Sequence, residues 1–115
     1  MSTYVLGDIH GCFDVLMHLL KVLHYDRDAD ELWFVGDLIN NGHQNLEVLR
    51  WVRDLGPKAV VTLGNHDLHM LAVASGQAKM RAKDTFNDVL DAPDAGELLA
   101  WLQHQPLAHY AHATR

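Results

Sequence analysis

The sequence contains a single cysteine, Cys12, so no disulfide can form within the chain. A lone cysteine is typical of proteins from a reducing compartment. No stretch of about 18 consecutive apolar residues is present, which excludes a membrane-spanning helix. The first residues lack the charged region and the apolar core of a secretory signal. These absences predict a cytoplasmic protein that does not enter membranes.

Positive charge is also scarce. Nine Lys and Arg residues stand against fifteen Asp and Glu, for a formal net charge of -6. Binding to a phosphate backbone needs clustered positive charge, so nucleic acid is not an expected partner. The phosphate-binding P-loop and the dinucleotide-binding glycine pattern are missing as well. The excess of carboxylates is compatible with bound cations.

The 115 residues, 49% of them apolar, suit one compact domain spanning residues 1–115. Short apolar runs that close on or near glycine predict three strands, at Thr3–Leu6, Glu31–Gly36 and Lys58–Gly64. Apolar residues at helical spacing predict helices over Phe13–Leu23, over Asn45–Leu55, from about Asp67 to Ala74, and from Asp94 to Pro106. The interval Ser75–Asp91 has weak periodicity and receives no assignment.

Capping residues are predicted for two of these helices. Asn45 is the expected cap of the second helix, and Asp94 with Glu97 has the spacing of a capping box. Strands that alternate with helices predict a parallel sheet of the α/β class. In such sheets, ligands bind at the C-terminal ends of the strands.

Each predicted strand leads into a motif that contains ligand-type residues. The motifs are GDIHGC after the first strand, GDLINNG after the second and GNHD after the third, and they supply Asp8, His10, Asp37, Asn65 and His66. Carboxylate, amide and imidazole groups together suit divalent cations such as Mn²⁺ or Co²⁺. A carboxylate such as Asp37 can bridge two metals, and His66 would then protonate a leaving oxygen.

Each motif has a structural alternative when it is taken alone. A Gly-Asp pair after a strand commonly caps the following helix, so one such pair indicates little. Three motifs at successive strand ends favour a shared metal site. His69, three residues after His66, could form a metal-binding pair with it, but we expect His69 to line the site or to pack beneath it.

The three motifs in this order resemble those of the calcineurin-like metallophosphoesterases. The flanking segments YVLGDIHGCFDVLMHLL, LGNHDLHMLAVASG and APDAGELLAWLQHQPL resemble the symmetrical bis(5'-nucleosyl)-tetraphosphatases of bacteria. The resemblance implies a mainly parallel sheet with crossover helices and a metal site at the strand ends. It also implies the hydrolysis of diadenosine tetraphosphate, a small dinucleoside polyphosphate, to two ADP molecules.

The resemblance further implies a role for each candidate residue. Asp8 and His10 match ligands of a first metal, Asp37 matches the bridging ligand, and Asn65 matches a ligand of a second metal. His66 matches the general acid beside the leaving group.

The sequence departs from the family in two places. The family's second motif ends in Arg-Gly, whereas Asn41 precedes Gly42 here, and a neutral amide cannot replace an arginine that grips phosphate. Family members also supply two further histidines to the second metal. Only His112, in AHAT, is a candidate for one of them. We therefore expect the N-terminal part of a metallophosphoesterase domain, with ligands sufficient for one metal.

Three functions remain open on the sequence. The first is the metal-dependent hydrolysis of diadenosine tetraphosphate. The second is serine/threonine protein phosphatase activity, which the segment LLAWLQHQPL disfavours. The third is a catalytically silent domain that binds metal or nucleotide, which Asn41 and the missing histidines support.

Overall fold

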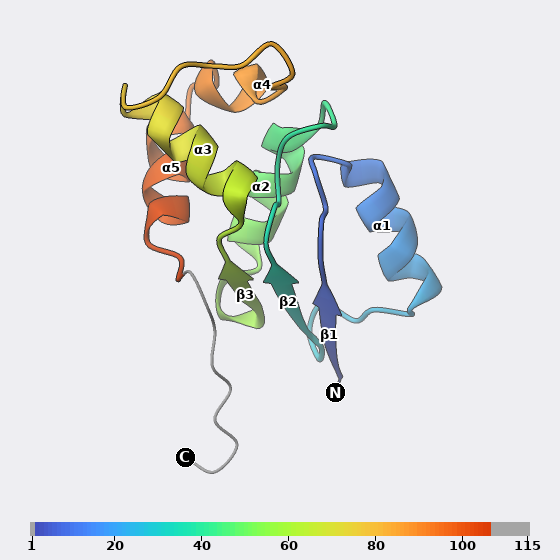
Figure 1. Ribbon diagram of the computed structural model, residues 1–115. Coiled ribbons are helices and arrows are strands. Elements are labelled where there is room, and N and C mark those ends of the chain that lie inside the picture. The colour runs from blue at the N-terminus through green and yellow to red at the C-terminus, as the bar shows by residue number, and fades with distance from the viewer. Residues whose placement is uncertain (1, 107–115) are drawn as a thin grey trace.

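The computed structural model describes residues 2–106 and contains a parallel sheet with helices packed around it (Figure 1). The strands are β1 (Thr3–Leu6), β2 (Glu31–Val35) and β3 (Ala59–Thr62), in the spatial order β1-β2-β3. Both strand pairs are parallel, so all three C-terminal ends lie at the same edge of the sheet. The predicted α/β architecture is confirmed.

The helices agree with the prediction to within a few residues. They are α1 (Phe13–Val22), α2 (Asn45–Asp54), α3 (Asn65–Ala74), α4 (Asn87–Leu90) and α5 (Ala95–Gln103), with a short 3₁₀ helix η1 at Gly56–Lys58. The interval Ser75–Asp91 contains only the four-residue α4. Among the described residues, no helix has the length and apolar character that a membrane crossing requires.

The predicted cap of α2 was wrong, and the predicted cap of α5 is at the right position but makes no capping bond, because both side chains have tertiary partners. Asn45 is the buried first residue of α2, which Gln44 precedes without a side-chain cap. Asp94 does precede α5, but it makes no capping hydrogen bond. Its carboxylate accepts two hydrogen bonds from the guanidinium of Arg50, at 2.7 and 3.0 Å.

One face of the sheet lies against the core. Its inward side chains alternate along the strands and pack with apolar residues of α1 and α2; among the core residues are Leu6, Leu32, Phe34, Val61, Leu16, Leu20, Val48, Leu49 and Val52. On α1, Leu19 lies outside this core and remains 38% exposed.

The opposite face of the sheet is partly open. Val5 lies beside Trp33 in the β1–β2 register, and Val35 follows two residues later on the same face. Val5 is 60% exposed and Val35 is 45% exposed. Parallel sheets are ordinarily covered on both faces, so this apolar surface is unusual for a sheet of this class.

Candidate metal centre

The loops after β1 and β2 are bonded to each other beyond the end of the sheet. His10 donates its backbone N–H to the carbonyl of Asp37 at 3.0 Å, and Gly42 donates its N–H to the carbonyl of His10 at 2.7 Å. Asp8, His10 and Asp37 all have positive φ, between 50° and 53°. Such backbone strain in non-glycine residues is concentrated at functional sites.

The loop after β3 is joined to the β2 loop by side-chain acceptors. The backbone N–H of His66 bonds to Oδ1 of Asp37 at 2.9 Å. Asp67 accepts from Leu38 N–H through Oδ1 and from Gly64 N–H through Oδ2, each at 3.0 Å. Asp67 is fully buried, so these two bonds replace its lost hydration. The first turn of α3 is thereby held against the β2 loop.

Gly64 is required by this close approach. A Cβ at position 64 would overlap Oδ1 of Asp37 and would lie 2.5 Å from the Asp37 backbone nitrogen. No side chain fits at that separation. The glycine of the GNHD motif therefore allows the β2 and β3 loops to touch.

The three loops bring His10, Asp37 and His66 together. One ligand atom from each of these side chains lies within 4.8 Å of the other two. The His10 and His66 rings meet edge to face, with centroids 5.4 Å apart. Two imidazoles and a carboxylate, all half-buried, form a donor set that fits Mn²⁺, Co²⁺ or Zn²⁺. Within residues 2–106, these three residues form the one group of His, Cys, Asp or Glu side chains that lie close enough together to hold a metal ion.

The other two predicted ligands lie beside this group. The side chain of Asp8 is 74% exposed, and its Oδ1 lies 3.9 Å from Nε2 of His10. Asn65 is the exposed first residue of α3. Their roles as ligands stay predictions, as do those of His10 and Asp37 and the acid role of His66. His112 lies outside the described residues.

Burial changes the acidity of Asp67. Desolvation raises its pKa to about 6, and the negative charge of Asp37 acts in the same direction. Hydrogen bonds from the backbone of Gly64 and Leu38 oppose the rise. The desolvation outweighs them because the carboxyl group is cut off from water.

Three polar residues lie at the site although the sequence analysis did not assign them to it. Asn40 in the β2 loop and Asn45 at the start of α2 are buried, and Asn45 accepts the backbone N–H of Asn40 at 2.7 Å. Asp84 reaches the same place from the unassigned interval and bonds to Asn40 at 3.0 Å. The asparagine-rich turn was visible in the sequence, but nothing near Asp84 indicates a partner 44 residues away.

His69 packs beneath the site, as expected. Its Nε2 lies 2.6 Å from Oδ2 of Asp84, and its ring meets Phe86 edge to face. In the described part of the chain, His69 belongs to no group that could bind a metal.

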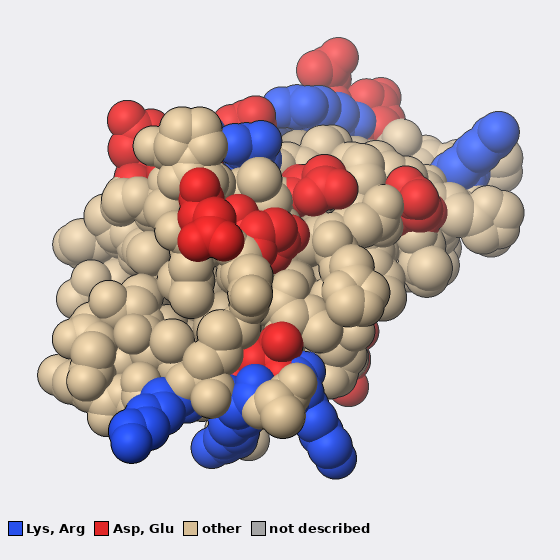
Figure 2. Space-filling view, turned by 90° about the horizontal axis from the view of Figure 1, so that it is seen from above, with Lys and Arg blue, Asp and Glu red and all other residues tan. Residues whose placement is uncertain are grey.

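Figure 2 views the molecule from above Figure 1, the side toward which the strands point. Asp and Glu side chains gather across the middle of this face, while Lys and Arg lie toward its margins (Figure 2). Negative charge around the strand ends attracts cations rather than free phosphate. An anionic substrate would therefore need bound metal at this face.

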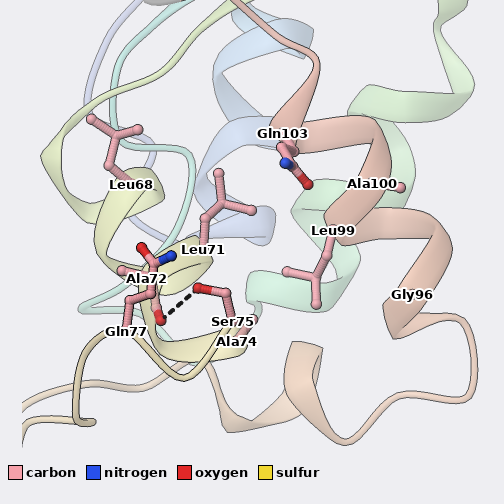
Figure 3. Close-up of a pocket in the computed structure, with 10 residues that line it drawn as sticks. All are labelled: Leu68, Leu71, Ala72, Ala74, Ser75, Gln77, Gly96, Leu99, Ala100 and Gln103. Atoms are coloured by element: carbon pink, nitrogen blue, oxygen red, sulfur yellow. Dashed lines mark hydrogen bonds between the residues drawn. The ribbon is translucent and has the colours of Figure 1, made fainter.

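A separate cavity of about 510 Å³ lies between α3 and α5 (Figure 3). Leu68, Leu71 and Leu99 project into it, and its polar lining consists of Ser75, Gln77 and Gln103. None of the lining side chains is titratable.

Comparison with known proteins agrees with this geometry. The sequence profile of the calcineurin-like phosphoesterases matches residues 1–112. The chain is 54% identical to the symmetrical bis(5'-nucleosyl)-tetraphosphatase of Thioalkalivibrio sulfidiphilus over 110 residues, covering 96% of this chain and 41% of the relative. It is also 54% identical to the enzyme of the same name from Dechloromonas aromatica, covering 95% and 40%.

A solved structure agrees as well. The crystal structure of a protein provisionally described as a diadenosine tetraphosphatase superposes with a TM-score of 0.71 at 27% identity, over 91% of this chain and 47% of that one. The chain thus spans about two fifths of the length of the curated relatives it matches. The matched part contains all three motifs.

Proposed function

The chain belongs to the calcineurin-like phosphoesterase family, and on that premise we propose that its metal centre serves the symmetrical hydrolysis of dinucleoside tetraphosphates. The observation that carries the proposal is the convergence of His10, Asp37 and His66 from three successive strand ends. The relatives named above, at about half identity, supply the substrate class.

In this proposal the side chains at the strand ends hold divalent cations such as Mn²⁺ or Co²⁺. Asp8 and His10 would bind one ion, Asn65 a second, and Asp37 would bridge them. Such ions acidify a bound water and offset the charge of the phosphates. The bond from His66 N–H fixes the carboxylate of Asp37 through Oδ1, and no donor within residues 2–106 bonds to its Oδ2.

The reaction is the cleavage of diadenosine tetraphosphate by water into two ADP molecules. A new P–O bond forms to the water oxygen, and the bond from that phosphorus to the central bridging oxygen breaks. The leaving ADP oxygen needs a proton, and His66 is the group proposed to donate it. Its ring is half-buried and lies against the His10 ring, at the same place as the carboxylate of Asp37.

A second candidate function is metal binding without turnover. It is favoured by one observation: within residues 2–106, the only group of His, Cys, Asp or Glu side chains within ligand distance of one another has three members. A single metal supplies a Lewis acid but lacks the two-sided clamp of a dinuclear site. Under this alternative the chain binds an ion and releases no ADP.

The two functions are separated by one experiment. The purified chain is loaded with Mn²⁺ or Co²⁺, its metal content is measured, and ADP release from diadenosine tetraphosphate is followed by chromatography. The hydrolase proposal expects ADP as the nucleotide product, and it expects Asp37→Ala to abolish turnover. Asp91→Ala, at an exposed carboxylate beyond α4, is the matched control and should be silent.

Turnover that survives Asp37→Ala would overturn the assignment of the metal centre. Bound metal with no ADP release would favour the second candidate. Release of AMP with ATP would show asymmetric cleavage and would contradict the proposed bond.

A further inference from the structure

The side-chain amide of Asn40 stands at the centre of a buried hydrogen-bond network beside His66. Asn40 is 3% exposed. Its Oδ1 accepts the backbone N–H of Thr85 at 2.8 Å. Its Nδ2 lies 3.0 Å from Oδ1 of Asp84 and 3.0 Å from Nδ1 of His66.

The partners settle which way this amide points. The backbone N–H of Thr85 can only donate, so it must face the amide oxygen of Asn40. The carboxylate of Asp84 only accepts when ionised, so it must face the amide nitrogen. Two independent neighbours therefore require the same orientation of the amide.

Both hydrogens on Nδ2 of Asn40 then have assigned acceptors. One bonds to the carboxylate of Asp84, and the other points at Nδ1 of His66. Nδ1 must accept this hydrogen, so it carries no proton of its own. A neutral His66 therefore has its proton on Nε2.

Asp84 is itself held firmly. Its side chain is 4% exposed, and its Oδ2 bonds to Nε2 of His69 at 2.6 Å and to the backbone N–H of Arg81 at 2.7 Å. Burial acts to raise the pKa of Asp84, but hydrogen bonds from Arg81, Asn40 and His69 outweigh it and lower the pKa. The hydroxyl of Thr85 donates to the carbonyl of Gly42 at 2.6 Å, which ties the same segment to the β2 loop.

We propose that Asn40, held by Asp84 and by the backbone of Thr85, is a positioning residue that fixes His66 in its Nε2-protonated tautomer. Asp84 is the second positioning residue, acting through Asn40. Neither residue needs to touch the substrate or the metal.

This tautomer decides between two roles for His66. A ring nitrogen that carries a proton cannot bind a metal, whereas it can donate to an oxygen. The neutral His66 ring therefore offers its Nε2–H as a hydrogen-bond donor to an oxygen rather than a lone pair to a metal, although it lies within ligand distance of His10 and Asp37. The inference deepens the proposed function and rests on it where it makes a substrate oxygen the partner of this Nε2–H. The tautomer itself follows from the hydrogen bonds alone.

The test is an NMR measurement of the ring nitrogens in ¹⁵N-histidine-labelled, metal-free protein, with the His66 signals assigned by a His66→Gln variant. Long-range proton–nitrogen correlations distinguish a protonated nitrogen from one that carries a lone pair. The spectra are recorded at a pH above which the ring-nitrogen shifts of His66 no longer change, so that only the neutral ring is observed. The expected result is a proton on Nε2 and a lone pair on Nδ1.

Two variants and a control sharpen the test. Asn40→Asp replaces the donor with an acceptor, so the proton of His66 should move to Nδ1. Asp84→Ala frees the Asn40 amide on one side, so the tautomer preference should weaken without reversing. Asn41→Asp is the matched control: Nδ2 of Asn41 lies 3.3 Å from Nδ1 of His10, so its effect should appear at His10 and leave His66 unchanged.

The outcomes are separable from those of the hydrolase assay. A wild-type His66 protonated on Nδ1 would overturn the inference, whether or not the protein hydrolyses its substrate. Nε2 protonation that reverses in Asn40→Asp would support it, even if no ADP is released; the hydrolase proposal alone would then fail. If Asn40→Asp does not fold, the wild-type tautomer and the Asp84→Ala spectrum decide.

Discussion

The backbone N–H of His66 donates to Oδ1 of Asp37 at 2.9 Å, across 29 residues of sequence. This bond joins the start of α3 to the loop after β2. It also fixes the orientation of the Asp37 carboxylate, and a hydrogen bond from a neutral amide does not cancel the charge of that group. The same side chain therefore links two loops and belongs to the group that could hold a metal ion.

Asp37→Asn should separate these two roles. An asparagine oxygen can still accept from His66 N–H, so the fold should persist, whereas the negative charge is lost. We expect the affinity for Mn²⁺ to fall by at least about tenfold, measured by isothermal titration calorimetry. Asp91→Asn controls for the change in net charge. Equal Mn²⁺ affinities for Asp37→Asn and Asp91→Asn would contradict the assignment of Asp37.

Asp67 should make the stability of metal-free protein depend on pH. Its pKa is raised from 3.8 in the unfolded chain to about 6 in the folded one. The folded state therefore binds the proton more tightly, so this group contributes stability that is complete below about pH 4 and is lost as pH rises through about 6. The shift corresponds to roughly 3 kcal/mol across that window.

The measurement for Asp67 is the free energy of unfolding by urea between pH 7 and pH 5. Asp67→Asn removes the titration and serves as the reference. The wild-type protein should gain stability relative to Asp67→Asn as the pH falls. A parallel pH dependence of the two proteins would show that the pKa of Asp67 is ordinary.

The sequence predicted the strands, most of the helices and the motifs at the strand ends, because all of these depend on local sequence. Apolar runs and turn residues set the three strands, and the motifs beyond them contain His10, Asp37 and His66. The capping prediction for Asn45 failed because a local propensity competed with tertiary partners. Asn45 accepts from Asn40 and donates to the carbonyl of Thr85 at 2.8 Å, and neither contact is visible as a local pattern.

The contacts of Asp84 could not be predicted from the sequence. It lies in a segment without periodicity, and its side chain makes contacts with Asn40 and His69 that span 44 and 15 residues. A short segment with few apolar residues takes its conformation from such contacts rather than from its own propensity. Only the folded structure reveals that this aspartate belongs beside His66.

Asn41 should limit the binding of phosphate. It is exposed at the site, has φ of 75°, and contacts Nδ1 of His10 through its amide. Asn41→Arg adds a charged fork that can bind phosphate oxygens in a bidentate manner. We expect tighter binding of ADP to metal-loaded protein, measured by calorimetry. The strain of about 1 kcal/mol at the positive φ should lower the stability of the folded protein, with ADP bound or absent alike. An unchanged affinity of Asn41→Arg for ADP would argue that a side chain at this position does not bind phosphate.

The open face of the sheet should promote self-association. Val5 and Val35 present exposed apolar surface beside Trp33. Replacing both with threonine keeps their shape and their strand propensity while adding a polar group. We expect the double variant to show less concentration-dependent association in light scattering. Val15→Thr with Val22→Thr, two valines of α1 that are 67% and 61% exposed, is the control. An equal effect of both pairs would show that general hydrophobicity, rather than this face, drives association.

Glycine-to-alanine changes at two positions should have opposite effects. At Gly64, a Cβ would overlap Oδ1 of Asp37, so Gly64→Ala should push the β3 loop away from Asp37 and lower the stability of the metal-free protein. At Gly96, in the first turn of α5, a Cβ meets nothing within 4 Å. Gly96→Ala should therefore stabilise the protein by about 0.5–1 kcal/mol, because alanine loses less backbone entropy in a helix. Thermal unfolding of both variants checks the pair.

Since metal binding needs Asp37 in place, Gly64→Ala should also weaken Mn²⁺ binding, whereas Gly96→Ala should leave it unchanged. A Gly64→Ala variant with wild-type stability and wild-type Mn²⁺ affinity would show that the loops after β2 and β3 do not touch as described.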